Sequence, residues 1–203
     1  GGGTTGSFTN VMDYITFTTV GVCTDFGDLA VTLPYTSGLS NETRGIFGSG
    51  GDPVVNIINY ITIATTGNAS DFGDLILSIR GTATCASTTR GIFAGGYDGS
   101  GASNVIQYIT IASTGNATDF GDLTTARYNA AGCSSSTRGI VGGGGSTGNW
   151  WNVIDYITIA STGNATDFGD LSVLYGRTYL SAASSSTTGV FAGGYVGPSN
   201  YYN

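Results

Sequence analysis

The sequence predicts an all-β fold built from repeated four-stranded antiparallel units. Three observations predict it: a twenty-residue segment recurs, its strand-forming runs contain no proline, and glycine and asparagine separate the runs. Residues 104–123 and 152–171 are identical except that Gln107 becomes Asp155, and looser copies begin at Asn10 and Asn56. Repeats at intervals of 46 to 48 residues indicate a solenoid or a propeller.

The recurring segment itself is expected to form two strands. Residues 156–159 read Tyr-Ile-Thr-Ile, and β-branched and aromatic side chains of this kind favour a strand. Residues 162–165 then form a tight turn, because glycine and asparagine accept positive φ at low cost. Residues 166–171 run back as the second strand.

Two further strands complete each unit. Residues 128–136 are rich in Ala, Gly, Ser and Cys, and such small side chains suit a crowded inner strand. A turn at residues 136–139 leads into the apolar run at residues 140–143. Four short antiparallel strands joined in this way are the pattern of a β-propeller blade.

The repeats resemble the kelch family over nearly the whole chain. A kelch repeat has an apolar strand that ends in a glycine pair, followed by spaced aromatic residues, and an arginine often precedes its inner strand. The glycine pairs are Gly95-Gly96, Gly143-Gly144 and Gly193-Gly194; the first aromatic residues are Tyr60, Tyr108 and Tyr156; Phe72, Phe120 and Phe168 replace the family's tryptophan; and the arginines are Arg80, Arg127 and Arg177. The resemblance implies a kelch-like β-propeller of divergent repeats. The motifs Asp-Phe-Gly-Asp-Leu and Thr-Arg-Gly-Ile-Phe are also similar to repeat proteins of tailed bacteriophages of marine bacteria, which implies a virion.

The repeats divide the chain into one repeat domain with at least four expected blades. Residues 30–75, 76–123 and 124–171 are complete blades, whereas residues 1–29 and 172–203 are partial ones. The first partial blade holds two outer strands and the last holds two inner strands, so the two could complete one split blade. Residues 200–203 restart the outer strand, which favours an array that continues with more blades.

Composition narrows the function. Charged residues are 9% of the 203, against the usual ~25%, and the apolar content of 40% argues against disorder. The net charge of −7 argues against nucleic acid as a ligand. No apolar run approaches the ~18 residues of a membrane span, so membrane insertion is not expected.

Catalytic chemistry has few of the residues it needs. The chain contains no histidine and no lysine, which removes Ser-His-Asp and Cys-His machinery, imidazole metal sites, and Schiff-base and P-loop chemistry. We expect no enzyme activity, no catalytic residues, no metal site and no cofactor. Cys23, Cys85 and Cys133 are interpreted as small buried residues, because equivalent positions on neighbouring blades do not suit disulfide geometry.

Repeated polar residues are expected to stabilise the turns. Asp25, Asp71 and Asp119 precede Arg44, Arg90 and Arg138 by nineteen residues each, and we expect each pair to form an ion pair at the turn end of a blade. Calcium binding by the paired aspartates is the alternative. Four Asn-x-Ser/Thr sites begin at Asn41, Asn68, Asn116 and Asn164, and they are formal N-glycosylation acceptors. The last three fall in the hairpin turns, where left-handed backbone geometry alone explains the asparagine; glycosylation in a secreted eukaryotic protein is the alternative.

The variable loops are the candidate binding surface. The tight hairpin turns lie on one face and are nearly unchanged between repeats, whereas the other loops differ in length and residues and lie on the opposite face. Aromatic rings on loops offer apolar area with a polar edge, which suits sugars and proteins. The candidate binding residues are Tyr97, Asp98, Tyr128, Trp150, Trp151, Tyr175, Tyr179 and Tyr195. The alternative is that these rings only pack against neighbouring blades or subunits.

The function expected from these observations is that of a non-enzymatic bacteriophage virion structural protein, a tail fibre or capsid appendage. Its partners would be other virion proteins or a host-surface glycan or protein, with self-association left open. A secreted or cell-surface kelch-like adhesin or fibril subunit is the first alternative. A polysaccharide-cleaving propeller enzyme is the second. The expected location is the virion, or the cell surface in the first alternative.

Overall fold

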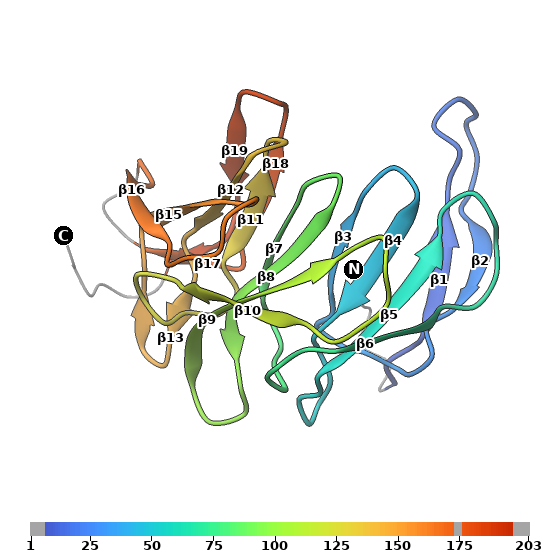
Figure 1. Cartoon of the computed structure of the whole chain (residues 1–203), viewed down its shortest axis with the longest axis horizontal. Helices are drawn as coiled ribbons and strands as arrows, with labels where there is room; N and C mark the ends of the chain where they lie inside the picture. The colour runs from blue at the N-terminus through green and yellow to red at the C-terminus, as the bar shows by residue number, and fades with distance from the viewer. Residues whose placement is uncertain (1–6, 173–175, 197–203) are drawn as a thin grey trace.

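The computed structural model describes residues 7–172 and 176–196, and within these ranges the chain forms β-strands and loops without a helix (Figure 1). The predicted all-β class with four-stranded antiparallel sheets is therefore confirmed. No helix in this part of the chain could serve as a membrane span.

Three consecutive four-stranded sheets form the body of the molecule, and each keeps its strands in chain order. The first unit contains β3 (Ser37–Ser40), β4 (Arg44–Gly48), β5 (Ile57–Thr62) and β6 (Ser70–Asp74). The second unit contains β7 (Ala83–Ala86), β8 (Arg90–Tyr97), β9 (Ala102–Thr110) and β10 (Thr118–Asp122). The third unit contains β11 (Ala131–Ser134), β12 (Arg138–Gly142), β15 (Val153–Thr158) and β16 (Thr166–Asp170).

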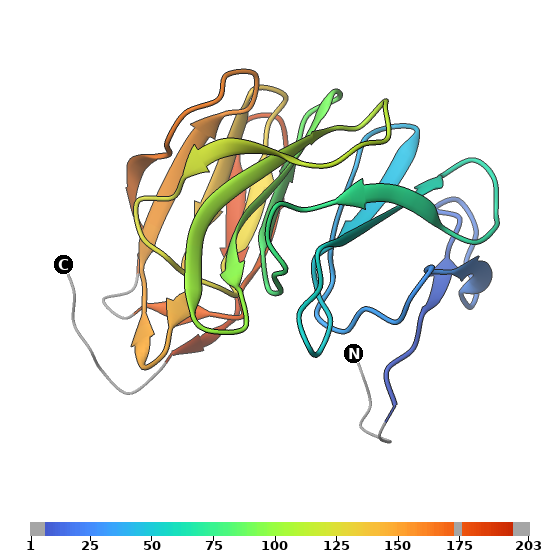
Figure 2. The same ribbon diagram turned by 60° about the horizontal axis from the view of Figure 1, so that its bottom comes forward.

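A two-stranded hairpin lies at each end of this row. The N-terminal hairpin, β1 (Val11–Tyr14) with β2 (Thr24–Asp28), is the counterpart of the last two strands of a unit. The C-terminal hairpin, β18 (Ser181–Ser184) with β19 (Gly189–Ala192), is the counterpart of the first two. The two hairpins share no sheet, and Figures 1 and 2 both show them well apart, with the N-terminal hairpin at the right.

Two short ladders extend the loops at one end of the units. They are β13 (Gly145–Ser146) with β14 (Asn149–Trp150), and β17 (Arg177–Thr178) with β20 (Tyr195–Val196).

The first strands of successive units lie next to each other, and their side chains bond across the units. Ser37 Oγ donates to the Thr82 carbonyl at 2.8 Å, and Ser134 Oγ donates to the Ala86 carbonyl at 2.8 Å. A Cβ at Gly132 would lie 2.3 Å from the carbonyl oxygen of Thr84. The predicted crowding of the inner strand is confirmed, and it explains why this strand is rich in Gly, Ala, Ser and Cys.

The hydrophobic core lies between units rather than within them. Phe72, 2% exposed, packs in one cluster with Ile109 and Ile111 of the following unit. Phe120, also 2% exposed, packs in the next cluster with isoleucines of the third unit. Each unit therefore buries its apolar face only when the next unit supplies its third strand.

Main-chain bonds at the Asp-Phe-Gly-Asp motif hold successive units together. The carbonyl of Phe72 accepts from the amide of Gly115 at 2.7 Å. A Cβ added at Gly73, where φ is 139°, would lie 2.6 Å from the carbonyl carbon of Gly115. Asn116 Oδ1 accepts from the Asp74 amide at 3.0 Å. The repeated glycines and asparagines are thus explained by contact between units.

The explanation of the turn asparagines by left-handed geometry is wrong. Gly67, Gly115 and Gly163 carry the positive φ of the three turns, whereas the asparagine that follows each of them does not. The side-chain oxygen of each asparagine instead accepts a main-chain amide of the preceding unit.

The predicted ion pairs between Arg44, Arg90, Arg138 and Asp25, Asp71, Asp119 are also wrong, because the only salt bridges among the described residues join other groups. Each arginine stacks on a tyrosine of the neighbouring strand, at 4.7, 4.5 and 4.6 Å from the ring centroid in chain order. Arg44 and Arg90 also donate to carbonyls of the next unit. The aspartates lie on the outermost strands, where Asp25 and Asp71 accept the amide two residues ahead.

The cysteines form no disulfide. Cys85 and Cys133 are buried and free, and Cys23 is exposed, so the expectation of burial is wrong for Cys23 alone. Burial raises the pKa of the Cys85 thiol to about 12, with a smaller contribution from Cys133.

Candidate functional site

Loops from every unit meet in a small hollow on the face that carries the variable loops. Its lining residues are Tyr35, Arg80, Tyr97, Tyr128, Asn129 and Tyr179, and its volume is about 230 Å³. We call it the tyrosine hollow. Three complete units and the C-terminal hairpin contribute to it, so the hollow exists only because the units stack.

An unusual backbone position brings these residues together. Tyr35, Gly81, Asn129 and Tyr179 occupy the same place, two residues before the first strand of their sheets, and their φ angles are 62°, 66°, 54° and 59°. Left-handed backbone is uncommon for residues other than glycine, and for tyrosine it is strained. The Asn129 amide donates to the Gly81 carbonyl at 2.8 Å, and the Tyr179 amide donates to the Asn129 carbonyl at 2.9 Å. These bonds between units hold the strained residues around the hollow.

Arg80 lies between two of the tyrosine rings. Its guanidinium carbon is 4.9 Å from the ring centroid of Tyr35 and 5.2 Å from that of Tyr97. Its Nη1 atom lies 3.1 Å from Oδ1 of Asp52, which forms an ion pair with it. Tyr97 in turn meets Tyr128 edge-on, with centroids 5.7 Å apart. The hollow therefore presents aromatic area and polar edges around a cation that is already paired.

Three of the candidate binding residues line the hollow: Tyr97, Tyr128 and Tyr179. Asp98 does not. Its Oδ1 accepts the Ser100 hydroxyl at 2.7 Å and the amides of Ser100 and Gly101 at 2.8 Å each. These bonds, the Ser100 hydroxyl first, lower the pKa of Asp98. Its carboxylate therefore shapes the β8–β9 loop.

The remaining candidates lie away from the hollow. Trp150 and Tyr195 pack edge-on at 6.1 Å between centroids, and both come from the short ladders. Trp151 is partly buried, and its amide donates to the Gly144 carbonyl at 2.8 Å. Tyr175 lies outside the described residues. The candidate set thus divides between the hollow and a separate pair of aromatic rings.

Sequence reasoning missed Tyr35, Arg80 and Asn129. The sequence comparison aligned Arg80 with Arg127. In the structure Arg80 forms a β-bridge with Tyr97, and the matching β-bridge of the next unit joins Gly145 to Tyr128, one residue after Arg127. A shift of one residue sends a side chain to the opposite face of a strand. Arg80 therefore faces the hollow, and Arg127 is fully buried. Aligning the arginines through the following inner strands would have given this shift.

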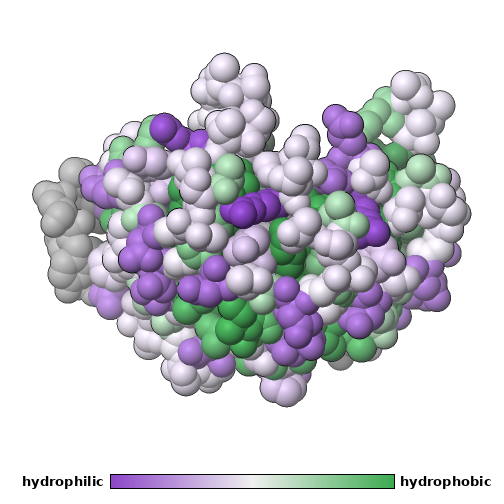
Figure 3. All heavy atoms as spheres, viewed as in Figure 1, coloured by the Kyte–Doolittle hydropathy of each residue, from purple (hydrophilic) through white to green (hydrophobic). Residues whose placement is uncertain are grey.

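The hollow offers binding groups: four phenols, one amide and one arginine with its carboxylate. Within residues 7–172 and 176–196, no three Cys, Asp or Glu side chains gather so that they could hold a metal ion. The face of the molecule drawn in Figure 3 is mostly pale, the colour of residues with intermediate hydropathy, in line with the low charge content.

No protein-family model matches this chain, and no match was found among curated proteins.

Proposed function

We propose that the stacked units are blades of a kelch-like β-propeller and that the chain is a non-enzymatic binding module of a bacteriophage virion, in a tail fibre or capsid appendage. Its tyrosine hollow would bind a saccharide of the host surface. The virion part of this proposal rests on the similarity of the repeated motifs to repeat proteins of marine tailed bacteriophages. The binding part rests on the hollow.

The observation that carries the proposal is the meeting of four tyrosines from four different repeats around one arginine. Two of them, Tyr35 and Tyr179, hold strained backbone and are 58% and 66% exposed, so burial of their rings does not explain them. Strained backbone tends to gather at sites of function. Exposed aromatic rings with hydroxyl groups suit the alternating apolar and polar faces of a sugar ring.

The chemistry of the hollow favours a neutral saccharide over an acidic one. Arg80 is the only cation among the described residues that line it, and Asp52 already lies 3.1 Å from that arginine. The chain carries a net charge of −7, which repels anionic glycans at long range. The volume of about 230 Å³ is below the ~300–1,000 Å³ of sites for drug-sized ligands, so the hollow suits one ring of a longer glycan.

The test is adsorption of the labelled protein to host cells and to their purified surface polysaccharide. We expect Tyr128→Ala to lose adsorption and Trp150→Ala, in the separate aromatic pair, to keep it. The melting temperature of each variant shows whether it is folded. Loss of adsorption with Trp150→Ala alone would instead assign the binding site to the aromatic pair of Trp150 and Tyr195.

Detection of this protein in purified virions by mass spectrometry would support the virion assignment. Its presence on cell surfaces without virions would favour the adhesin alternative instead.

A further inference from the structure

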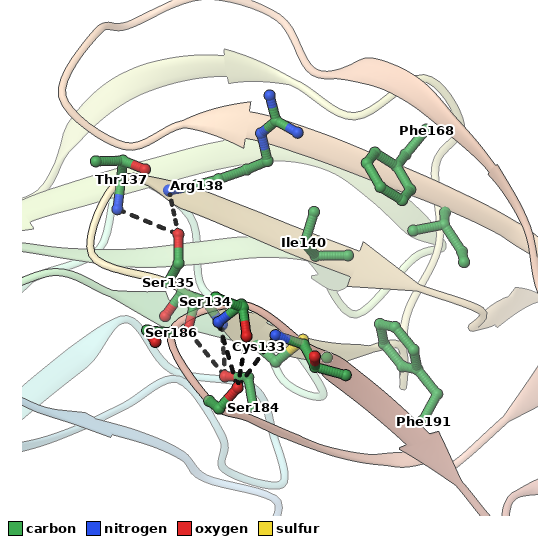
Figure 4. A pocket seen from close by; sticks show the side chains of 15 residues that line it. Cys133, Ser134, Ser135, Thr137, Arg138, Ile140, Phe168, Ser184, Ser186 and Phe191 are labelled. Atoms are coloured by element: carbon green, nitrogen blue, oxygen red, sulfur yellow. Dashed lines mark hydrogen bonds between the residues drawn. The ribbon is translucent and has the colours of Figure 1, made fainter.

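A hollow lies between the third unit and the C-terminal hairpin (Figure 4). Its volume is about 480 Å³, and its apolar lining includes Ile140, Ile154, Phe168 and Phe191. Phe168 is 55% exposed, whereas Phe72 and Phe120, at the same position in the earlier units, are each 2% exposed. The space beside this phenylalanine is therefore filled in the first two units and open in the third.

The repeats show what fills it. Behind Phe120 the place is taken by Ile157 and Ile159 of the following unit, on the third strand and just beyond it. Arg90 marks the same contact, because its Nη1 donates to the Ile159 carbonyl at 2.9 Å. Arg138, the counterpart of Arg90, lines the hollow and stacks on its tyrosine, but its guanidinium donates no hydrogen bond within the described chain. The missing occupant is a hairpin of the β15–β16 type.

The N-terminal hairpin of this chain has the matching side chains. Ile15 and Phe17 stand where Ile157 and Ile159 stand in the third unit, and they are 56% and 98% exposed. Cys23, at the position of the partly buried Ala165, is exposed. One end of the molecule thus lacks the apolar residues that the other end exposes. We infer that the N-terminal hairpin of a second copy of this chain seats on the C-terminal hairpin and third unit of the first, head to tail.

Both strands that would meet have an open edge. In the first unit β4 pairs with β5, with Gly45 opposite Ile61 and Phe47 opposite Asn59. By the same register β19 would pair with β1 of the second copy, with Gly189 opposite Ile15. Among the described strands, β19 pairs with β18 alone and β1 pairs with β2 alone. β5 has β4 beside it and runs for six residues, to Thr62. β1 has no such neighbour and ends after four residues, at Tyr14.

Charge complementarity selects the same partner. In each unit contact, an amide in the loop after one unit's last strand donates to the central residue of the next unit's third strand: Ala30 to Asn59, Ile76 to Gln107, and Thr124 to Asp155. Three residues further along these loops stand Leu33, Ile79 and Arg127, which pair by position with Asn59, Gln107 and Asp155. Only the last pair is ionic, and it is bonded at 2.9 Å. Arg177 holds the corresponding place before the C-terminal hairpin. Its Nη1 donates to the Gly193 carbonyl at 3.0 Å, but its Nε is buried and has no hydrogen-bond partner among the described residues. The residue that the N-terminal hairpin would bring to it is Asp13, which is exposed.

The contact is heterologous, because the two surfaces come from opposite ends of the molecule. A heterologous contact repeats into a closed ring or an open filament. A second copy is favoured over the chain's own hairpin because the two hairpins lie well apart and share no sheet (Figures 1 and 2). One feature departs from the repeats: Val22 stands where Asn68, Asn116 and Asn164 cap the preceding unit, so that bond is absent from the proposed contact.

The test uses two variants of the 203-residue chain, each with one damaged end. Phe17→Asp damages the exposed hairpin, and Phe168→Asp damages the hollow; both side chains are more than half exposed, so folding should survive. Under reducing conditions, light scattering after size-exclusion chromatography should give assemblies of several copies for the wild type and one chain for each variant alone. An equimolar mixture should give two chains, because each variant keeps one intact end.

A charge exchange tests the register of the contact. Asp13→Arg should weaken the two-chain complex by at least about 30-fold, the effect of breaking a buried charge pair, and Arg177→Asp on the other variant should restore it. Labelling of Cys23 should slow in the mixture. A wild type that stays one chain at high concentration, as closure by its own hairpin would give, overturns the inference. So does a mixture without two-chain complexes, or assembly that reductant abolishes.

Discussion

Arg127 and Asp155 form an ion pair at 2.9 Å with 0% and 1% of their side chains exposed, and one unit earlier the same two places are held by Ile79 and Gln107. This pair accounts for the single difference between the two twenty-residue copies. Both Gln107 and Asp155 accept the amide that follows the preceding unit's last leucine, at Ile76 and Thr124. Only Asp155 also faces an arginine, so only there does the chain use a carboxylate.

Replacing Asp155 by glutamine, the residue at this place in the preceding repeat, should therefore destabilise the protein strongly. Asp155→Gln can still accept the hydrogen bond from the Thr124 amide, but it leaves the buried Arg127 without a charged partner. Burial lowers the pKa of Arg127, and Asp155 opposes that effect. We expect a loss of about 3–5 kcal/mol in the free energy of unfolding. The double variant Arg127→Ile with Asp155→Gln recreates the pair of the second unit and should recover most of it. Urea unfolding measures both, and equal losses in the two would contradict the explanation.

Repeat spacing and strand patterning predicted the all-β class and the four-stranded sheets because both are properties of one unit. The same reasoning placed Tyr97, Tyr128 and Tyr179 on the variable face, and the structure brings them into one hollow. The face on which a loop lies depends only on the number of strands that separate it from the other loops.

Contacts between units could not be predicted in the same way. The arginines of β4, β8 and β12 were assigned to aspartates by spacing, but each guanidinium stacks on the tyrosine of the adjacent strand instead. Arg80 was placed one residue out of register, which reverses the face to which it points. How units stack decides both cases, and a period in the sequence does not contain that information.

Arg90 and Arg138 provide a matched pair for measuring the contact between units. Both stack on a tyrosine, but only Arg90 reaches a carbonyl of the next unit. Arg90→Met should cost about 1.5–3 kcal/mol more than the stacking alone, which is worth about 0.5–1 kcal/mol at an exposed site. Arg138→Met should lose only the stacking contribution. Chemical denaturation of monomeric protein, in the Phe17→Asp background, gives the comparison, and equal costs would contradict it.

Gly121 and Gly169 separate backbone strain from contact between units. Their φ angles are 139° and 129°, so alanine is strained at both. An added Cβ would lie 2.5 Å from the carbonyl carbon of Gly163 at the first site and would meet nothing within 4 Å at the second. We expect Gly121→Ala to be less stable than Gly169→Ala by about 1–3 kcal/mol in the same monomeric background. Thermal or urea unfolding with equal midpoints for the two variants would show that strain alone fixes these glycines.

The buried thiol of Cys85 should make stability fall at alkaline pH. Its pKa is raised to about 12 in the folded chain, so above a pH of about 9 the unfolded state releases a proton that the folded state keeps. Stability from this group is complete below about pH 9 and is lost by about 1.4 kcal/mol per pH unit up to about 12. Cys85→Ala removes this dependence, and the difference between the two proteins at pH 8 and pH 10.5 isolates it from tyrosine ionisation. Parallel pH profiles would mean that the thiol is not protected from water.

Binding of the purified protein to an array of neutral and acidic glycans tests the central proposal most directly, with wild type, Tyr97→Ala, Tyr128→Ala and Trp150→Ala compared at equal concentration. The tyrosine hollow has one paired cation, aromatic walls and room for one sugar ring. We predict that the wild type and Trp150→Ala retain the same neutral glycans and that both tyrosine variants lose them while remaining folded. Retention of those glycans by both folded tyrosine variants, or binding of acidic glycans alone, would contradict it.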